Sequence, residues 1–496
     1  PKFDLRIEAP EKAPVAKAVD EIDFLIKGIE IEGATYYQMD EIIIPFNKLI
    51  GKKISLDELR QSVQKLEDRY RADGFFLVRV IIPPQKVSDG IFKIKVIEGY
   101  INAAFAEGGS TAARKKIELI IKKLVNKRPI DLKSLERVLL LLNDIPGISG
   151  SGVLRQGSEL GTSELVVTIN PLPKISYVSS LNNSSSKTMG LYGASINATI
   201  NNLEFPSSVN LGFSTALKND NDRLFNPILK AFNANYSSAI GNDGMIFSIG
   251  GIYANAEPQG SIKPLGILSK SYSVSPRLRY PIKRSRNESK YLEAGFTVGR
   301  SETFLLDTST TKDKSTVADF VFSLTNDTWF GGSSQINFSL FRGLDLFGSR
   351  AESIKIPTPS ISNFKQNFTK YKFSGNHTQP LEKINANIKF SLQAQWTNDK
   401  LLAGEQITFG GLSIGKGYDG GAVAGDKGFG VVIEISKTIS KNPLSIFSKS
   451  NLEIYSFIDY AEARLLAEPK SSFEATNSYL GSHGLGARLT DASGML

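Results

Sequence analysis

The sequence predicts an α+β region of two small tandem modules, followed by an all-β barrel that spans a membrane. Helix starts and stops can be read before residue 174, whereas from about residue 175 onward the chain holds no convincing helix and alternates polar with apolar residues. No window of about 18 apolar residues exists, which excludes a spanning helix. Alternating strands escape that test because only one of their faces is apolar.

The first module is expected over residues 22–100. Its elements follow in the order strand, helix, helix, strand, strand, at 24–31, 39–50, 55–73, 75–83 and 92–96. Ser55 and Glu58 form a capping box at the start of the second helix, and Gly74 supplies its stop. Pro45 must kink or shorten the first helix, because proline cannot donate the backbone hydrogen bond.

The second module is expected over residues 101–174 and repeats the same order. Its elements are placed at 100–107, 117–124, 131–142, 151–156 and 163–170. Asp131 caps the second helix, which Pro146 and Gly147 close. Two α+β modules fit this order better than one α/β domain, because α/β folds alternate strand and helix singly.

The region 175–496 is read as the barrel. The clearest strand runs from Ile384 to Trp396, where apolar and polar residues alternate without a break. Strands of about 10 residues suit a tilted bilayer span, and a polar face of Ser, Asn and Gln suits a water-filled lumen. A pair of soluble β-sandwiches remains the alternative. Fourteen strand candidates lie near residues 179, 192, 209, 231, 246, 275, 294, 320, 338, 370, 390, 432, 455 and 484.

The composition argues against an enzyme and predicts no cofactor. The chain has no cysteine, which rules out disulfides, thiolate zinc sites and a cysteine nucleophile. The sequence has two histidines, His377 and His483, which are far apart. It therefore offers few residues from which a histidine metal cluster or a Ser-His-Asp triad could be built. The net charge of +9 is spread along the chain, which argues against a nucleic-acid-binding arm.

A glycine-rich segment lies in the last fifth of the sequence. Nine glycines lie between positions 410 and 430. The stretch from Gly410 to Gly417 nearly fits a phosphate-binding loop, but Gly417 replaces the hydroxyl residue that would bind Mg²⁺. A flexible surface turn with an ordinary solvated lysine is the other open interpretation.

Four strings give the chain its resemblance to a known family, and they lie in the family's order. They are LIGKKISLDEL at 49–59, YRADGFFLVRVIIPPQKVSDGIFKIKVIEGYI at 70–101, LLNDIPGI at 141–148, and GGLSIGKGYDGGAVAGDKG at 410–428. The chain resembles the two-partner secretion transporters, also called TpsB or haemolysin secretion/activation proteins. The resemblance implies two periplasmic POTRA domains, here 22–100 and 101–174, and a sixteen-stranded barrel in the bacterial outer membrane.

The resemblance also implies a functional loop within the lumen, at about 397–428. Its tip looks like the family's VRGY/F motif, here Ser413, Ile414, Gly415, Lys416, Gly417 and Tyr418. In the family the basic residue pairs with an aspartate of an F-x-D string on the barrel wall, and Asp459 holds that place here. Lys416 stands where arginine is usual and cannot offer a bidentate fork, so the tether should be looser or replaced by other contacts.

The function implied is translocation of an unfolded exoprotein, recognised by its N-terminal secretion domain, through a barrel that lies in lipid and is inserted by the barrel-assembly machinery. An assembly insertase of the same superfamily and a passive porin are the alternatives. Strand addition to a module edge at 75–82, or binding in its groove with the 55–73 helix, would capture the cargo. The candidate side chains are Phe76, Val78 and Val80, with plain core packing as the competing explanation.

The two ends of the chain carry a further expectation. About fourteen strands are counted where the family has sixteen, so the last hairpin is expected to be absent. Residues 1–21 are expected to be a linker, with the family's plug helix missing or shortened.

Overall fold

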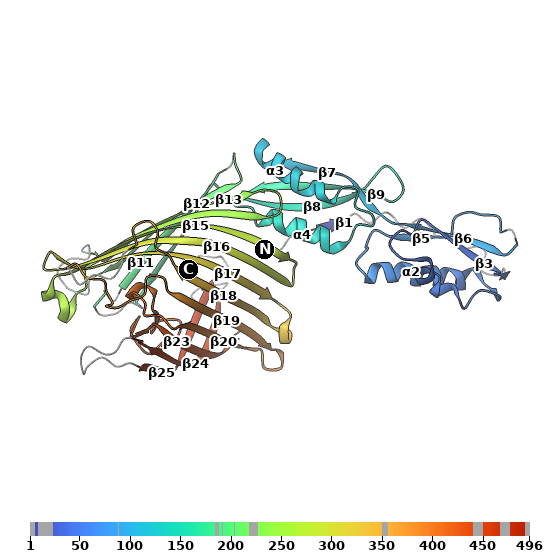
Figure 1. Ribbon diagram of the computed structural model, residues 1–496. Helices are drawn as coiled ribbons and strands as arrows, with labels where there is room; N and C mark the ends of the chain where they lie inside the picture. The colour runs from blue at the N-terminus through green and yellow to red at the C-terminus, as the bar shows by residue number, and fades with distance from the viewer. Residues whose placement is uncertain are drawn as a thin grey trace. The chain divides into compact units, whose positions relative to one another are not determined.

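The computed structural model describes residues 5–7, 23–87, 89–183, 188–190, 192–202, 204–217, 227–349, 356–439, 450–466 and 477–491 (Figure 1). The chain divides into two compact units. The first holds residues 1–172 with two short segments, 202–206 and 241–244, and the second holds the remainder.

The first module of the first unit keeps the predicted order, except that its first strand is divided in two and a two-residue strand that was not predicted lies between its helices. Its elements are β2 (Phe24–Leu25), β3 (Gly28–Glu32), α1 (Met39–Ile42), η1 (Ile44–Phe46), β4 (Lys53–Ile54), α2 (Leu56–Ala72), β5 (Arg79–Ile81) and β6 (Ile91–Ile97). The capping box is confirmed, because the side chain of Ser55 accepts from the N–H of Glu58 at 3.3 Å. Pro45 lies in η1 and leaves α1 only one turn long, as expected.

The strand predicted at 75–83 is shorter than expected. After Gly74, in the left-handed region at φ +96°, the N–H of Phe75 bonds back to the carbonyl of Tyr70 at 2.9 Å. The chain therefore makes a turn against the last residues of α2 before β5 begins. The three-stranded sheet has the order β3-β6-β5, so β5 is an edge strand, and it pairs antiparallel with β6.

The second module also follows its predicted order. Its elements are β7 (Tyr100–Gly108), α3 (Thr111–Ile121), η2 (Lys122–Leu124), α4 (Leu132–Asn143), β8 (Ile148–Gln156) and β9 (Thr162–Pro171). An unexpected strand, β1 (Leu5–Ile7), pairs in parallel with β8 and completes a sheet of order β1-β8-β9-β7. The description of 1–21 as a linker is therefore wrong at 5–7, while 8–22 lies outside the described residues.

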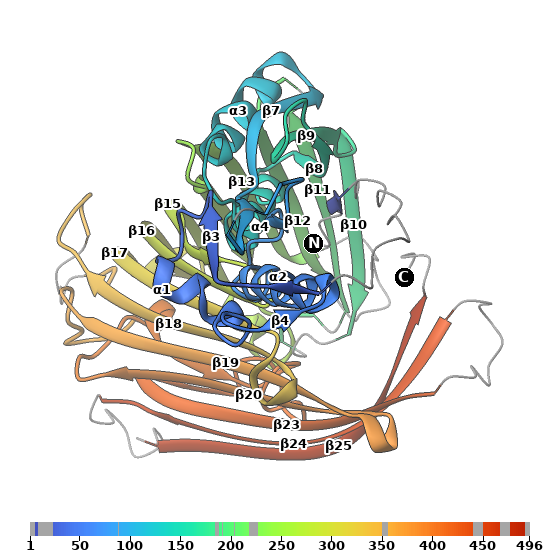
Figure 2. The ribbon, with the colours of Figure 1, turned by 90° about the vertical axis from the view of Figure 1, so that its right-hand side faces the viewer.

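The second unit is built on one curved sheet of fourteen strands (Figure 2). In order they are β10 (Ile175–Asn182), β11 (Tyr192–Asn202), β12 (Ser207–Leu217), β13 (Pro227–Ile240), β14 (Met245–Ala256), β15 (Ile267–Arg284), β16 (Glu288–Leu305), β17 (Thr308–Asn326), β18 (Ser333–Gly343), β19 (Thr369–Leu381), β20 (Ala386–Thr397), β23 (Lys427–Ile439), β24 (Ser450–Arg464) and β25 (Asn477–Asp491). Each of the fourteen predicted candidates lies in or beside one of these strands. Within the described residues, the recorded pairings run from β10 to β25 and none joins β25 to β10.

The helical segments of this unit, within its described part, are short 3₁₀ turns. They are η3 (Gly260–Leu265), η4 (Trp329–Gly331), η5 (Glu382–Ile384) and η6 (Ala403–Glu405). The strand predicted from Ile384 begins two residues later, because Asn385 adopts a left-handed conformation at φ +50° and ends the turn η5. No helix in the described residues is long and apolar enough to cross a membrane.

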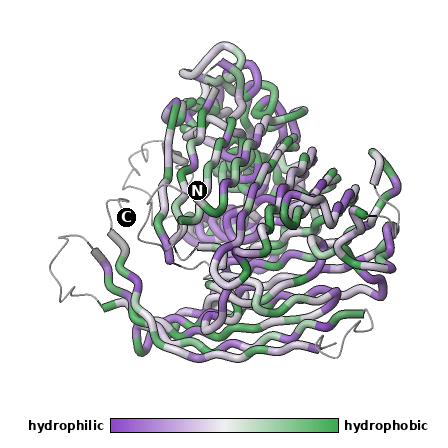
Figure 3. Tube along the Cα trace, turned by 90° about the vertical axis from the view of Figure 1, so that its left-hand side faces the viewer, coloured by the Kyte–Doolittle hydropathy of each residue, from purple (hydrophilic) through white to green (hydrophobic). Residues whose placement is uncertain are grey.

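Polar and apolar residues follow one another along the strands, as the hydropathy colouring shows (Figure 3). On β23 and β24, Ile433 pairs with Ile458, and these side chains are 42% and 60% exposed. The neighbouring pair, Val432 and Asp459, is buried. Because successive side chains of a strand point to opposite faces, the sheet has one exposed apolar face and one covered face.

The covered face carries a long insertion. Strands β20 and β23 pair antiparallel, yet residues 398–426 lie between them. This segment, the inserted loop, contains η6 and a small hairpin of β21 (Ile407–Phe409) and β22 (Val423–Gly425). It corresponds to the loop predicted at about 397–428.

Candidate functional site

The inserted loop folds back on itself through two glycine positions. Gly410 has φ +115°, and a Cβ there would lie 2.2 Å from the carbonyl oxygen of Asp419. Gly415 has φ +86°, and there is no space for a side chain at this position, because a Cβ would lie 2.8 Å from the side chain of Leu480. Only glycine fits both the backbone angle and the close approach. The glycine-rich composition of this segment is therefore a requirement of an ordered turn.

A small apolar core fixes the loop on the sheet. Its buried members are Ile407, Phe409, Ile414, Val432, Ala461, Ala463 and Leu480. The first three come from the loop and the others from β23, β24 and β25. Ile414, the second residue of the predicted motif, is 1% exposed. Burial of these side chains stabilises the attachment of the loop to the sheet by roughly 25 cal/mol per Å² of apolar surface. The loop is therefore held by apolar packing as well as by polar contacts.

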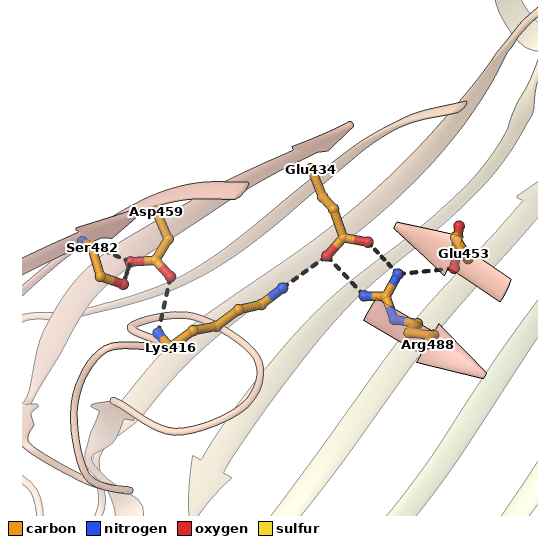
Figure 4. Close-up of polar contacts among 6 residues, drawn as sticks. All are labelled: Lys416, Glu434, Glu453, Asp459, Ser482 and Arg488. Carbon is orange, nitrogen blue, oxygen red and sulfur yellow. Dashed lines mark hydrogen bonds and ion pairs between the residues drawn. The ribbon is translucent and has the colours of Figure 1, made fainter. Parts of the chain in front are cut away.

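Lys416 holds the sheet at two points (Figure 4). Its peptide N–H donates to Asp459 Oδ2 at 2.9 Å, and its ammonium lies 2.8 Å from Glu434 Oε2. The sequence led us to expect an ion pair between Lys416 and Asp459. The two residues are in contact, but the predicted ion pair is wrong, because Asp459 binds the peptide N–H and the ammonium binds Glu434. The backbone of the loop tip approaches the wall so closely that Asp459 meets the peptide group, while the long side chain extends past it to Glu434.

Asp459 also joins two strands of the wall. Its Oδ1 accepts from the N–H of Ser482 at 3.0 Å and from the hydroxyl of Ser482 at 2.6 Å. The same hydroxyl accepts from the N–H of Gly417 at 3.1 Å, and the hydroxyl of Tyr418 donates to the carbonyl of Gly481 at 3.2 Å. Asp459 is 3% exposed, and its hydrogen bonds supply what a buried carboxylate requires. The loop tip is therefore bonded to both β24 and β25.

Glu434 binds two cationic side chains, those of Arg488 and Lys416. Arg488 of β25 donates to both of its carboxylate oxygens, at 2.6 and 2.9 Å, and Lys416 lies on the other side. Arg488 also donates to Glu453 at 3.2 Å. Bidentate guanidinium–carboxylate pairs are short and directional. A lysine from the loop thus completes a charge network whose other members belong to the wall (Figure 4).

Two aromatic rings lie beneath these cations. The Nζ of Lys416 is 4.6 Å from the ring centre of Phe457, and the guanidinium of Arg488 is 3.9 Å from that of Tyr455. These rings lie over Gly484 and Gly486 of the neighbouring strand, with which they are paired in register. A Cβ at Gly486 would be 2.2 Å from the ring of Tyr455. The glycines therefore make space for a cation–π layer.

The base of the inserted loop is anchored separately. Lys370 of β19 is 2% exposed, and its ammonium lies 2.6 Å from the carboxylate of Glu405 and 2.7 Å from the carbonyl of the same residue. Asp426 accepts from the N–H of Leu401 at 3.0 Å and from that of Leu466 at 2.7 Å. A buried lysine requires such pairing. The loop therefore leaves and rejoins the sheet through fixed points.

The predicted motif residues are brought together, with one exception. Ser413 is exposed at the tip, whereas the backbone or side chains of the other five contact the sheet or pack in the loop core. Sequence reasoning missed Glu434, Ser482 and Arg488. Glu434 had a usable signal, since it is the acidic residue on the polar face of a strand whose other face is Val431, Ile433 and Ile435.

Two of the three candidates in the first module fit the competing explanation, which is core packing. Val78 and Val80 are buried in the module's core, and only Phe76 keeps part of its surface. Both valine side chains therefore contribute to the core of the module and not to its surface. At the outer edge of β5, the N–H of Val80 donates to the carboxylate of Glu67 at 3.0 Å. Glu67 also pairs with Arg79 at 3.1 Å.

Comparison of the sequence with known families gives two matches. Residues 161–489, more than half of the chain, match the family described as haemolysin secretion/activation protein ShlB/FhaC/HecB. Residues 24–99 match the ShlB-type POTRA domain. Among curated relatives, a heme/hemopexin transporter protein HuxB of Haemophilus influenzae is 24% identical over 99% of this chain and 85% of its own length. The outer membrane transporter CdiB-2 of Burkholderia pseudomallei is 23% identical over 87% of this chain and 74% of its own.

Solved structures show the same fold. CdiB from Escherichia coli superposes with a TM-score of 0.72 at 18% identity, over 98% of this chain and 87% of that one. CdiB from Acinetobacter baumannii gives a TM-score of 0.62, also at 18% identity and with the same coverage.

Proposed function

The chain belongs to the haemolysin secretion/activation family, and from this premise we propose that the inserted loop is the gate of its translocation path. The protein is an outer-membrane transporter of the two-partner secretion class, with periplasmic POTRA structure, and it serves a secreted exoprotein. It is a secretion channel and not an enzyme. Family membership also sets aside the insertase and the passive porin as primary functions.

The observation that carries the gate proposal is the double contact of Lys416. One residue of the loop tip bonds to Asp459 through its backbone and to Glu434 through its side chain. Both acceptors are buried and belong to the wall. Hydrogen bonds to charged groups contribute about 1.5–3 kcal/mol each, so a few of them hold the loop without making it immovable. An unfolded chain would then pass when these contacts are broken.

The test is a secretion assay with two variants of the wall. Asp459→Asn and Glu434→Gln keep the shape of each side chain and remove its charge. We expect both to reduce the amount of exoprotein released into the medium, while heat-modifiable migration on gels shows normal barrel insertion. Glu462→Gln is the matched control, because this residue lies on the same strand as Asp459 but on the opposite face. Unchanged secretion in both variants would refute the role of these contacts.

We further propose that the first module captures the exoprotein at the edge of β5. The edge is not open in the free protein, since Glu67 occupies the N–H of Val80. An incoming strand would replace this carboxylate by its own carbonyl group, which makes capture a competition. Arg79 is half exposed and pairs with Glu67. It would hold the Glu67 carboxylate close to β5, so that the carboxylate can return to the N–H of Val80 when the exoprotein is released. We also propose that the barrel-assembly machinery inserts this protein into the outer membrane.

The capture proposal is tested with Glu67→Ala in the full chain. We expect the variant to cross-link more of the exoprotein's secretion domain, because the competing carboxylate is gone. Asp68→Ala is the control, since Asp68 is exposed on the same helix. Equal cross-linking in all three proteins would remove β5 as the capture edge and leave the gate proposal untouched.

A further inference from the structure

The exposed face of the sheet carries a groove that neither secretion nor gating requires. It has a volume of about 520 Å³ and is formed by side chains of β18, β19, β20, β23 and β24. Its apolar and aromatic lining consists of Phe338, Tyr371, Phe373, Ala394, Trp396 and Phe429. Trp396 is 56% exposed, so the floor of the groove is open to its surroundings.

This groove faces away from the inserted loop. On β23 and β24, Phe429 is paired with Glu462, whereas the buried residue Asp459 is paired with Val432. Phe429 and Val432 are three positions apart on the same strand, and an odd step along a strand places their side chains on opposite faces. The groove therefore belongs to the apolar face, which lies against lipid in an outer-membrane protein.

The groove lies at the extracellular ends of its strands. β10 begins directly after the periplasmic modules, so its first residue marks the periplasmic end, and the strands of the antiparallel sheet then alternate in direction. β20 is the eleventh strand in the order and runs the same way as β10. Its last residue, Thr397, and the first residue of β23, Lys427, are consequently at the end remote from the periplasm. Trp396 lies at the depth where tryptophan is enriched in membrane barrels.

Two cations stand at this end of the groove. Lys427 and Arg464 are directly opposite each other on β23 and β24. Both line the groove, and the Nζ of Lys427 is 4.4 Å from the ring centre of Trp396. Like charges directly opposite on neighbouring strands destabilise a sheet. Within the described part of the chain, no ion pair with an acidic side chain is found for either cation, and Glu462, which also lines the groove, is not bonded to them.

We propose that this groove binds a phosphorylated glycolipid of the outer leaflet, of the lipid A type. Its acyl chains would lie on the aromatic floor, and a phosphate would sit between Lys427 and Arg464 and relieve their repulsion. A phosphate dianion suits the pair because the guanidinium offers parallel donors and the ammonium a compact charge. The extracellular position selects a lipid of the outer leaflet.

Native mass spectrometry of the full chain, titrated with bisphosphorylated lipid A, tests the proposal. We expect the Lys427→Gln/Arg464→Gln double variant to lose at least about tenfold in affinity, which corresponds to about 1.4 kcal/mol. Lys437→Gln is the matched control. It lies ten positions along the same strand and face, in a second groove formed with Ile435 and Leu485.

Three results would overturn the assignment. The first is equal affinity of the double variant and the unaltered protein. The second is equal binding of a lipid A whose phosphates have been removed. The third is equal binding of phosphatidylglycerol, which would indicate a general preference for anionic lipid. Heat-modifiable migration of the double variant is measured in parallel, and normal migration ensures that a lost affinity is not lost folding.

Discussion

Asp459 accepts a hydrogen bond from the peptide N–H of Lys416 at 2.9 Å, so the wall holds the loop by its backbone. The side chain of the lysine goes elsewhere, to Glu434. A contact with a peptide group does not depend on which side chain occupies the position. This explains how lysine can stand where the related proteins are expected to carry arginine without the loop losing its attachment to Asp459.

Lys416→Met separates the two contacts. The variant keeps the peptide N–H for Asp459 and loses the ion pair with Glu434, which Arg488 still neutralises. We therefore expect a smaller secretion defect in Lys416→Met than in Asp459→Asn. Side-by-side secretion assays at equal barrel insertion measure the difference. A Lys416→Met defect larger than that of Asp459→Asn would mean that the side chain, and not the backbone contact, holds the loop.

A disulfide between loop and wall should lock the gate. A Cβ at Gly417 would lie 2.9 Å from the Cβ of Ser482, and disulfide-bonded Cβ atoms are about 3.8 Å apart, so a small shift suffices. The chain contains no cysteine, which leaves the engineered pair without competitors. We expect Gly417→Cys/Ser482→Cys to block secretion and a reductant to restore it. Ser482→Cys alone is the control. Full secretion by the oxidised double variant would show that the tip need not leave the wall.

Gly486→Ala should destabilise the sheet next to the gate. Its Cβ would collide with the ring of Tyr455, over which the guanidinium of Arg488 lies. Overpacking of this kind costs about 1–3 kcal/mol. Gly481→Ala on the same strand is the control, because the nearest atom to its Cβ is 3.6 Å away. The temperature of heat-modifiable unfolding on gels should fall in Gly486→Ala alone, and equal temperatures for the two variants would contradict the packing described.

Residues 20–174 should fold without the sheet of the second unit. The two modules have their own capped helices and buried cores, the first of which includes Leu59, Leu66 and Tyr70. We expect the isolated fragment to be soluble and to give the circular dichroism of a mixed α/β protein. A random-coil spectrum would remove the boundary near residue 174.

The first module should lose stability above about pH 10. Burial, together with the Glu98 carboxylate that accepts from its hydroxyl at 3.0 Å, raises the pKa of Tyr70 above its ordinary value of 10.0. The unfolded tyrosine ionises first, so stability present below pH 10 is lost as the pH rises further. We expect Tyr70→Phe to weaken this alkaline loss in the fragment, whereas Tyr36→Phe, at an exposed position, should not. Denaturant titrations between pH 8 and about 11 provide the measurement, and parallel curves for Tyr70→Phe and the unaltered fragment would contradict it.

The sequence by itself determined the order of the main helices and strands, but it did not indicate the short strands β1 and β4. Ser55, Asp131 and Gly74 act through local backbone hydrogen bonds, and the alternation within the fourteen strands reports which face each side chain takes. Local signals of this type survive in any tertiary context. They also identified the glycine-rich tip, because positive backbone angles at Gly410 and Gly415 leave a mark in composition.

Only the tertiary structure decided which groups meet across strands. Register places Asp459 beside Ser482 and Glu434 within reach of Arg488, and these pairs are separated by 23 and 54 positions in the chain. The ammonium of Lys416 meets Glu434 and not Asp459 because the backbone of the loop already lies against Asp459. The burial of Val78 and Val80 depends on where the chain turns after Gly74. Periodicity assigns a face to a side chain, but distance across that face is fixed by packing, because every neighbour contributes to it.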